Sequence, residues 1–285
     1  MAQFRIISLT SLAMLAFAGN SLLCRLALKN TEIDAASFTT VRLLSAALTL
    51  FLVLRFTKKA VGLSGSWPSA VALFIYAAGF SFAYINLTAA TGALLLFSYV
   101  QISMIGYGIW KGEVLRPLQM LGLALALAGL LGLVAPGLAA PPLLNAVLMI
   151  GAGVAWGIYS LRGRGAGDPT AVTAGNFLRT VPITIVLSAL AFKNISLDAA
   201  GFAYALASGA LTSGLGYAIW YRALPGLKAT EAAIVQLSVP VIAALGGIIL
   251  LGENLSLRLI LASIAILSGI ALVVYRKPAS PAKAT

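Results

Sequence analysis

The sequence is poor in the residue types that most enzymes and soluble proteins use. Only 9% of its 285 residues are charged, seven residues are acidic, and histidine is absent. An ordinary soluble domain carries about 25% charged residues, so these few charges cannot cover the surface of a soluble protein. Histidine is also the commonest metal ligand and the neutral-pH proton switch. We therefore expect no catalytic residues, no metal site and no cofactor.

Cysteine is almost absent too, and the single Cys24 excludes an internal disulfide. The net charge of +12 is the one large charge imbalance. A nucleic-acid-binding protein would gather its basic residues into a stripe or patch, whereas here they occur singly or in pairs between apolar runs. This pattern is typical of anchors at a membrane surface. It predicts the lipid bilayer, and not nucleic acid, as a partner.

What the chain has in abundance is long apolar runs, with hydrophobic residues at 61%. A hydrocarbon core about 30 Å thick requires roughly 20 apolar residues per helix. Ten runs of about that length occur, at residues 6–28, 35–56, 69–88, 92–110, 118–135, 143–161, 170–190, 200–221, 230–251 and 258–275. We predict an all-α integral membrane protein with ten transmembrane helices, followed by a disordered tail at 276–285.

The first run has features of a processed signal. Ala16-Phe17-Ala18 resembles a signal-peptidase site, and SLLC at 21–24 resembles a lipoprotein box. However, Leu23 is too bulky for the position before a lipidated cysteine, and only Arg5 supplies a charge before the run. We expect the run to be kept as the first span.

The basic residues also predict the orientation. Two of the 19 lie inside spans, thirteen fall on the side of the amino terminus, and four fall on the opposite side, namely Arg25, Lys29, Lys193 and Arg258. Because cytoplasmic loops collect Lys and Arg, both termini are predicted to be cytoplasmic. The expected location is the inner (plasma) membrane of a bacterium.

The chain repeats itself. The stretch IWKGEVL at 109–115 returns as ILLGENL at 249–255, and earlier pairs at a shift of 137 are Arg25 with Arg162, Arg42 with Arg179, Gly79 with Gly216 and Tyr84 with Tyr221. Five spans per copy is an odd number, so the second copy must enter the membrane from the opposite side. We predict a 5+5 inverted-topology repeat, with residues 1–140 and 141–275 as its halves. Such repeats are typical of transporters that bind substrate between the halves.

The sequence also resembles a known family. YAIWYRALPGLKATEAAIVQLSVPVIAALGGIILLGENL at 217–255 is similar to the penultimate two spans of the EamA-type ten-span branch of the drug/metabolite transporter superfamily. Weaker resemblances lie at WGIY (156–159) with Arg162 and Arg164, and at Asn20, Arg25 and Arg42. Pro240 departs from the repeat because no proline lies near Gln101. The resemblance implies export of amino acids and other small metabolites.

Aromatic and polar side chains inside the spans are the candidates for a substrate pocket. Tyr76, Phe80 and Tyr84 recur every four residues and so share one helical face. Mid-span polar groups are costly against lipid, so they either tie helices together or face a water-filled space. The other predicted substrate-binding residues are Asn20, Tyr99, Gln101, Trp156, Tyr159, Tyr217 and Gln236. Plain packing is the alternative for each.

Two arginines lie within predicted spans, and two readings of them stay open. Arg42 and Arg179 lie roughly 10 to 15 Å along their helices at 1.5 Å per residue. A guanidinium inside the bilayer must find partners. It either docks a substrate carboxylate or pairs with helix-end carbonyls.

Two Gly-Glu pairs close spans. Gly112 and Gly252 can adopt the left-handed conformation that ends a helix, which would place Glu113 and Glu253 in the first turn of the next helix, where the macrodipole favours a negative charge. We expect these four residues to be structural. No carboxylate is then left at mid-membrane, and no Walker loop is present. Both points favour facilitated transport that ATP does not drive.

The sequence as a whole predicts an alternating-access exporter of amino acids, with aromatic or large apolar ones favoured by the aromatic candidates. A broad-specificity drug or nucleotide-sugar carrier of the same fold is the alternative, and a channel is a third reading. We expect a monomer or a weak homodimer. A membrane enzyme is disfavoured because the chain lacks histidine and clustered acids.

Overall fold

The computed structural model describes residues 2–57, 64–112, 114–137, 140–163, 167–227 and 235–274, and within them every regular element is helical. The long helices are α1 (Ala2–Asn30), α2 (Ala35–Phe56), α3 (Trp67–Tyr84), α4 (Ala89–Trp110), α5 (Pro117–Val134), α6 (Leu143–Gly163), α7 (Pro169–Leu190), α11 (Ser238–Leu251) and α12 (Leu257–Val274). Between α7 and α11 lie η1 (Phe192–Asn194) and a composite helix of α8 (Ala199–Ala207), η2 (Ser208–Leu215), α9 (Gly216–Ala223) and η3 (Leu224–Gly226).

The prediction of an all-helical membrane protein is confirmed. Nine helices of the described chain are long and apolar enough to cross a bilayer, with Ala199–Gly226 counted as one. The tenth predicted run matches α11, which is shorter, at 14 residues. The start of that run falls among residues 228–234, which lie outside the described residues, as do Glu113, Arg164 and the predicted tail.

Acidic residues begin several helices and so do not reach the middle of the bundle. Asp34, Asp168 and Asp198 are the N-caps of α2, α7 and α8, and each accepts hydrogen bonds from backbone N–H groups of the first turn. Asp34 also accepts from the Ser196 N–H at 3.0 Å. Burial would raise the pKa of Asp34, but hydrogen bonds from Ser37, Ser196 and Ala36 outweigh burial and lower that pKa.

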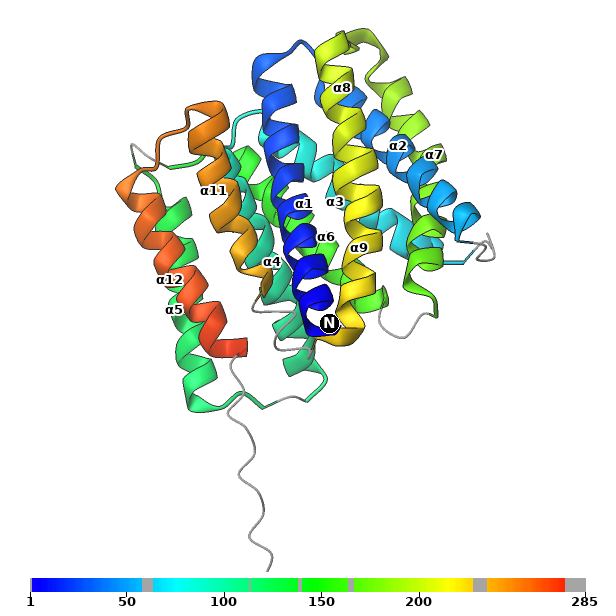
Figure 1. The fold of residues 1–285 in the computed structure, drawn as a ribbon. Helices are drawn as coiled ribbons and strands as arrows, with labels where there is room; N and C mark the ends of the chain where they lie inside the picture. The colour runs from blue at the N-terminus through cyan, green and yellow to red at the C-terminus, as the bar shows by residue number, and fades with distance from the viewer. Residues whose placement is uncertain are drawn as a thin grey trace, which may run out of the picture.

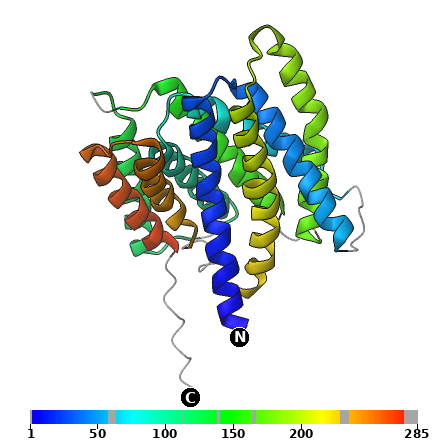
Figure 2. The same cartoon turned by 45° about the horizontal axis from the view of Figure 1, so that its top comes forward.

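The long helix α1 runs through the middle of the bundle (Figure 1), where it packs against α11 on one side and against α8, η2 and α9 on the other. The view in Figure 2 shows the same order. Helices α5 and α12 pack together at one edge, and α2 packs against α7 at the other, while α6 packs against α3 and α4. The start of α1 and the end of α12 lie toward the same end of the bundle (Figure 1).

Small residues let the composite helix lie very close to its neighbours. A Cβ at Gly209 would meet the Arg42 carbonyl oxygen at 2.2 Å, and a Cβ at Gly216 would meet the Ala16 Cβ at 2.9 Å. Close approach through glycine is common between helices in membranes. This packing brings η2 against the segment of α2 that carries Arg42.

Candidate substrate cavity

A small internal cavity lies where six elements converge. The space open to the centre of a water-sized sphere is about 20 Å³, room for about one water molecule. The cavity is therefore too small in this structure for a molecule the size of an amino acid, which would fit only after the walls move apart. Its lining residues come from α1, α3, α4, α6, η2 and α9, and are Phe17, Asn20, Tyr76, Phe80, Leu96, Phe97, Trp156, Thr212 and Tyr217.

Aromatic rings form much of the wall, with Trp156 at their centre. The ring centroid of Trp156 lies 4.7 Å from Tyr76, 5.1 Å from Tyr217 and 5.3 Å from Tyr159. Phe17 approaches Tyr217 edge-on at 5.8 Å. Tilted and edge-on pairs of this kind add to the stability gained by burial, so the walls are well ordered and mainly apolar.

A central polar cluster crosses this aromatic wall, and it comprises Asn20, Arg42, Tyr76, Ser208, Thr212 and Ser213. Asn20 is its hub. The Asn20 Oδ1 atom accepts hydrogen bonds from Ser208 Oγ at 2.7 Å and Thr212 Oγ1 at 3.3 Å, and its Nδ2 donates to the Tyr76 hydroxyl at 3.2 Å. The three hydroxyls on η2 belong to a π-helical stretch. Such stretches are rare and often occur at functional sites.

Arg42 is the charged member of the cluster and only 1% of its surface is exposed. Its Nη2 donates to the Tyr76 hydroxyl at 2.8 Å and its Nε donates to Ser213 Oγ at 3.3 Å. The guanidinium carbon lies 4.7 Å from the Phe80 ring centre and 5.2 Å from that of Tyr76. The buried Nη1 atom has no hydrogen-bond partner among the described residues. Arg42 therefore holds an incompletely bonded charge behind two rings that line the cavity.

Arg179, which the repeat pairs with Arg42, lies in a different setting. Its Nη1 donates to the carbonyl oxygens of Ser64 at 2.7 Å and of Gly175 at 2.9 Å. It ties the segment before α3 to α7, and it does not line the cavity. The two arginines thus have different surroundings although the sequence presents them as equivalents.

Five of the predicted binding residues line the cavity: Asn20, Tyr76, Phe80, Trp156 and Tyr217. The other five do not, namely Tyr84, Tyr99, Gln101, Tyr159 and Gln236. Tyr84 is fully buried against Phe80, and its hydroxyl donates to the Ala89 carbonyl at 3.3 Å. Tyr159 packs behind Trp156 and accepts from Asn176 Nδ2 at 3.4 Å.

Four lining residues were not predicted: Phe17, Leu96, Phe97 and Thr212. Phe17 is part of the Ala16-Phe17-Ala18 motif that resembles a processing site, and nothing else in the sequence marks it as a lining residue. Leu96 and Phe97 look like any apolar residue of a span. Thr212 was the one with a usable signal, because a mid-span hydroxyl lies four residues after Ser208, on the same face.

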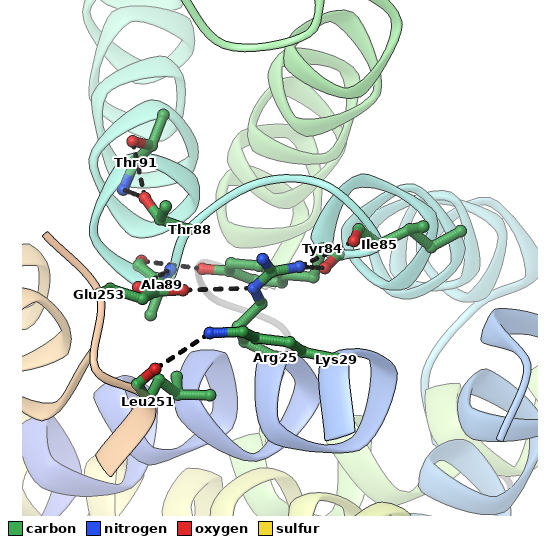
Figure 3. A network of polar contacts seen from close by, with 9 residues as sticks. All are labelled: Arg25, Lys29, Tyr84, Ile85, Thr88, Ala89, Thr91, Leu251 and Glu253. Atoms are coloured by element: carbon green, nitrogen blue, oxygen red, sulfur yellow. Dashed lines mark hydrogen bonds and ion pairs between the residues drawn. The ribbon is translucent and has the colours of Figure 1, made fainter. Parts of the chain in front are cut away.

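A second polar group, the ion-pair cluster of Arg25, Lys29 and Glu253, lies near the carboxyl end of α1 (Figure 3). The Arg25 Nε atom lies 3.2 Å from Glu253 Oε1, the one ion pair within the described part of the chain. The Arg25 Nη1 atom donates to the carbonyls of Tyr84 at 2.9 Å and Ile85 at 2.7 Å. Both contacts place a cation at the carboxyl end of α3, where the helix dipole favours it.

Glu253 binds three helices together. Its Oε2 accepts from the Ala89 N–H at 2.8 Å, at the start of α4 (Figure 3). Lys29 reaches the same corner, and its Nζ donates to the Leu251 carbonyl at 3.0 Å. Beneath these contacts lies a small apolar cluster of Leu22, Ala89 and Leu251 with Leu26 against it. The end of α11 is thus held to α1, α3 and α4 by polar contacts and little apolar surface.

The placement of Glu253 differs from the prediction. Gly252 has the expected left-handed backbone, with φ of 61°, and the Glu253 N–H donates to the Gly247 carbonyl at 3.0 Å, which closes α11. However, α12 begins only at Leu257, so Glu253 is not in its first turn. The side chain turns inward and caps α4 instead. Gly112 has φ of 91° in the matching corner, while Glu113 lies outside the described residues.

This chain is similar to a transporter family and to several bacterial and archaeal proteins. The model of the EamA-like transporter family matches residues 143–275. An uncharacterized protein of Pseudomonas aeruginosa is 57% identical over 274 residues, 96% of each chain. The threonine/homoserine exporter RhtA of Salmonella typhimurium is 33% identical over 174 residues, 57% of this chain and 58% of its own. An uncharacterized transporter of Archaeoglobus fulgidus is 28% identical over 86% of this chain and 89% of its own.

The fold has a counterpart among solved structures. One crystal structure matches with a TM-score of 0.66 at 18% sequence identity, covering 93% of this chain and 97% of its own. At that identity the likeness shows the fold alone. The family match and the relatives above confirm the resemblance seen in the sequence. Residues 143–275 belong to the EamA-like transporter family, and the relatives above support the same assignment of the chain to the drug/metabolite transporter superfamily.

Proposed function

We propose that this protein exports amino acids and related small metabolites from the bacterial cytoplasm through the central cavity. The observation that carries the proposal is a closed, mainly aromatic cavity with one polar hub, in a chain of a transporter family. Its similarity to a threonine/homoserine exporter supports amino acids as the substrate class. The aromatic walls favour aromatic or large apolar side chains.

Alternating access is the proposed mechanism, and the packing of the helices supports it. If residues 1–140 and 141–275 form inverted halves, each contact between halves should have a counterpart. The contact between α3 and α6 corresponds to the contact of α1 with η2 and α9. The contact between α4 and α6 corresponds to the contact between α11 and α1. Lining residues come from both halves, so rocking of one half against the other would open the cavity.

The ion-pair cluster is the proposed closure at one end of the pathway. It lies near the carboxyl end of α1 and joins three helices of the first half to α11 of the second. In the predicted orientation, with cytoplasmic termini, this end faces the periplasm. Separation of Glu253 from Arg25 and Ala89 would free α11 to move. The Phe80–Tyr84 ring contact, at 4.7 Å between centroids, links this corner to the cavity wall.

We further propose that transport is facilitated by the substrate gradient. The cavity lining in the described chain contains no carboxylate, and a proton-coupled carrier normally keeps an ionisable group in the pathway. Amino-acid efflux from proteoliposomes should therefore be saturable and unchanged by an imposed pH gradient. Strong acceleration by the gradient would contradict this part of the proposal, and flux that does not saturate would indicate a channel.

Thermal stabilisation of the detergent-solubilised protein tests the substrate class. The ligands are the twenty amino acids, homoserine and a set of nucleotide sugars. We expect at least one large apolar or aromatic amino acid to raise the melting temperature. Trp156→Ala should abolish that shift because it removes the central wall residue. Trp110→Ala is the matched control, since Trp110 is 76% exposed and does not line the cavity.

Two results would overturn the assignment. Stabilisation by nucleotide sugars and by no amino acid would favour the nucleotide-sugar carrier instead. Equal affinity in Trp156→Ala and the unmodified protein would show that the amino acid binds elsewhere.

A further inference from the structure

The unpaired nitrogen of Arg42 requires a physical explanation. A guanidinium away from water costs several kcal/mol unless it is paired and hydrogen-bonded. Arg42 is 1% exposed, and the one ion pair of the described residues involves Arg25 instead. Two neutral hydroxyls accept hydrogen bonds from two of its nitrogens, and ring faces lie against the guanidinium. Nη1 is left without a partner in the described chain. The positive charge of Arg42 therefore has no anionic partner among the described residues.

The Tyr76 hydroxyl is incompletely used as well. It accepts from Asn20 Nδ2 at 3.2 Å and from Arg42 Nη2 at 2.8 Å. Because both contacts are donated to the oxygen, its own proton meets no acceptor in the contacts of the described residues. Tyr76 lines the cavity. A cavity-lining O–H group polarised by a guanidinium is a strong donor toward a negative group.

Both donors lie at the part of the cavity wall that Tyr76 and Phe80 form. The guanidinium carbon lies 5.2 Å from the Tyr76 ring centre and 4.7 Å from that of Phe80, and both rings line the cavity. Since the closed cavity admits about one water molecule, these rings must move to admit a substrate. Their movement is what would bring Nη1 into contact with it.

We propose that Tyr76 and Arg42 form the subsite for the substrate carboxylate, an inference that rests on the amino-acid transport proposed above. The Tyr76 hydroxyl donates to one carboxylate oxygen and Arg42 Nη1 donates to the other. Charge-assisted hydrogen bonds of this kind are shorter and stronger than neutral ones. The ammonium group is left to the faces of Trp156 and Tyr217, where cation–π attraction operates.

This arrangement makes the carboxylate the recognised group. A substrate whose carboxylate is replaced by an amide presents no negative charge, so Arg42 stays unneutralised when that molecule binds. Arg179 offers no second subsite, because it hydrogen-bonds to the carbonyls of Ser64 and Gly175 and lies away from the cavity lining. We therefore expect the site to bind one carboxylate of each substrate molecule.

The experiment compares the best amino-acid ligand with its carboxamide and its methyl ester by calorimetry on the full chain in detergent. We expect the unmodified protein to bind the acid about 10- to 100-fold more tightly than either analogue, both of which lack the carboxylate charge, the ratio of roughly one charged hydrogen bond. Arg42→Gln should abolish the difference, and Tyr76→Phe should reduce it. Arg179→Gln is the matched control and should keep the full ratio.

The outcomes separate this inference from the function on which it rests. If the carboxamide binds the unmodified protein as tightly as the acid, or if Arg42→Gln keeps the ratio, the carboxylate subsite is wrong while amino-acid binding stands. If neither acids nor amides bind, the proposed function itself fails. The analogue series needs no variant, so the inference stays testable even if Arg42→Gln does not fold.

Discussion

Two arginines on neighbouring helices, Arg25 of α1 and Arg42 of α2, show how differently the same side chain can be surrounded. Arg25 has an anionic partner at 3.2 Å and two helix-end carbonyls, so its charge is neutralised inside the protein. Arg42 is more deeply buried yet has only hydroxyls and ring faces as partners, with one nitrogen unbonded.

This difference matches the two proposed roles, closure of the pathway at Arg25 and recognition of the substrate at Arg42. A group whose charge is already neutralised by a partner inside the protein has little to offer a ligand, and its loss weakens the fold. A group that is kept charged and incompletely bonded is costly in the empty protein, and a ligand can repay that cost. Stability and binding measurements on the two clusters should therefore respond in opposite ways.

The largest expected effect is on stability at the ion-pair cluster. Glu253→Ala leaves the Arg25 charge without its partner and the Ala89 N–H unbonded, so unfolding should become easier by about 3–5 kcal/mol. Thermal unfolding in detergent measures this. Glu253→Gln should lose less, because its amide oxygen still accepts from Ala89.

A sharper test compares the loss of stability in Arg42→Gln with the loss in Glu253→Ala. Arg42→Gln removes a charge without stranding an opposite one, so the loss of stability should be clearly smaller. Equal losses in the two variants would show that both arginines stabilise the fold to the same extent.

A second test separates the helices around the central polar cluster. Gly209→Ala places a methyl group 2.2 Å from the Arg42 carbonyl oxygen, which forces η2 away from α2. Overpacking of this kind costs about 1–3 kcal/mol, and it should also lower substrate affinity by displacing Ser213. Gly132→Ala is the control, since no atom lies within 4 Å of its added Cβ. If both variants unfold at the same temperature, the close contact at Gly209 is wrong.

A third test uses Asp34, a carboxylate outside both clusters, as a reference for pH. Hydrogen bonds outweigh burial and hold its pKa below the ordinary value of 3.8. Its stabilisation is therefore fully present above pH 3.8 and is lost as pH falls through the lower folded-state pKa. Asp34→Ala should cost about 0.5–2 kcal/mol at neutral pH, as for other N-caps. Thermal unfolding from pH 2.5 to 7 should show the gap closing only in acid; a constant gap would argue against the assignment.

The smallest expected effect is at Lys29. Its ammonium makes one contact, to the Leu251 carbonyl, and the side chain is exposed. Lys29→Met should change the free energy of unfolding by no more than about 0.5 kcal/mol. A loss near that of Glu253→Ala would mean that Lys29, rather than Arg25, holds the cluster together.

The sequence predicted the helices well because their signal is local. Twenty apolar residues and a capping residue such as Asp34 or Asp168 lie within one segment, and the described helices follow the predicted runs closely. The shared face of Tyr76 and Phe80 was also local, since a spacing of four sets it. Tyr84 has the same spacing but lies one turn nearer the end of α3, so it packs beside Ala89 and away from the cavity.

The rest depended on contacts between distant segments. Glu253 caps a helix that begins 164 residues earlier in the chain, and no spacing rule carries that information. Arg42 and Arg179 look equivalent in the sequence, yet only one meets the hydroxyls of η2. Thr212 carried a local signal in its spacing of four from Ser208, but its place in the cavity wall depends on the packing of α1 and α9 against η2.

The tightness of the resting cavity has a consequence for the cell that carries this protein. In the conformation described, the central cavity has room for about one water molecule, so at this point there is no space for a file of solvent along which protons could hop. In the exporter proposed above, protons would then cross at this cavity only while its walls are apart.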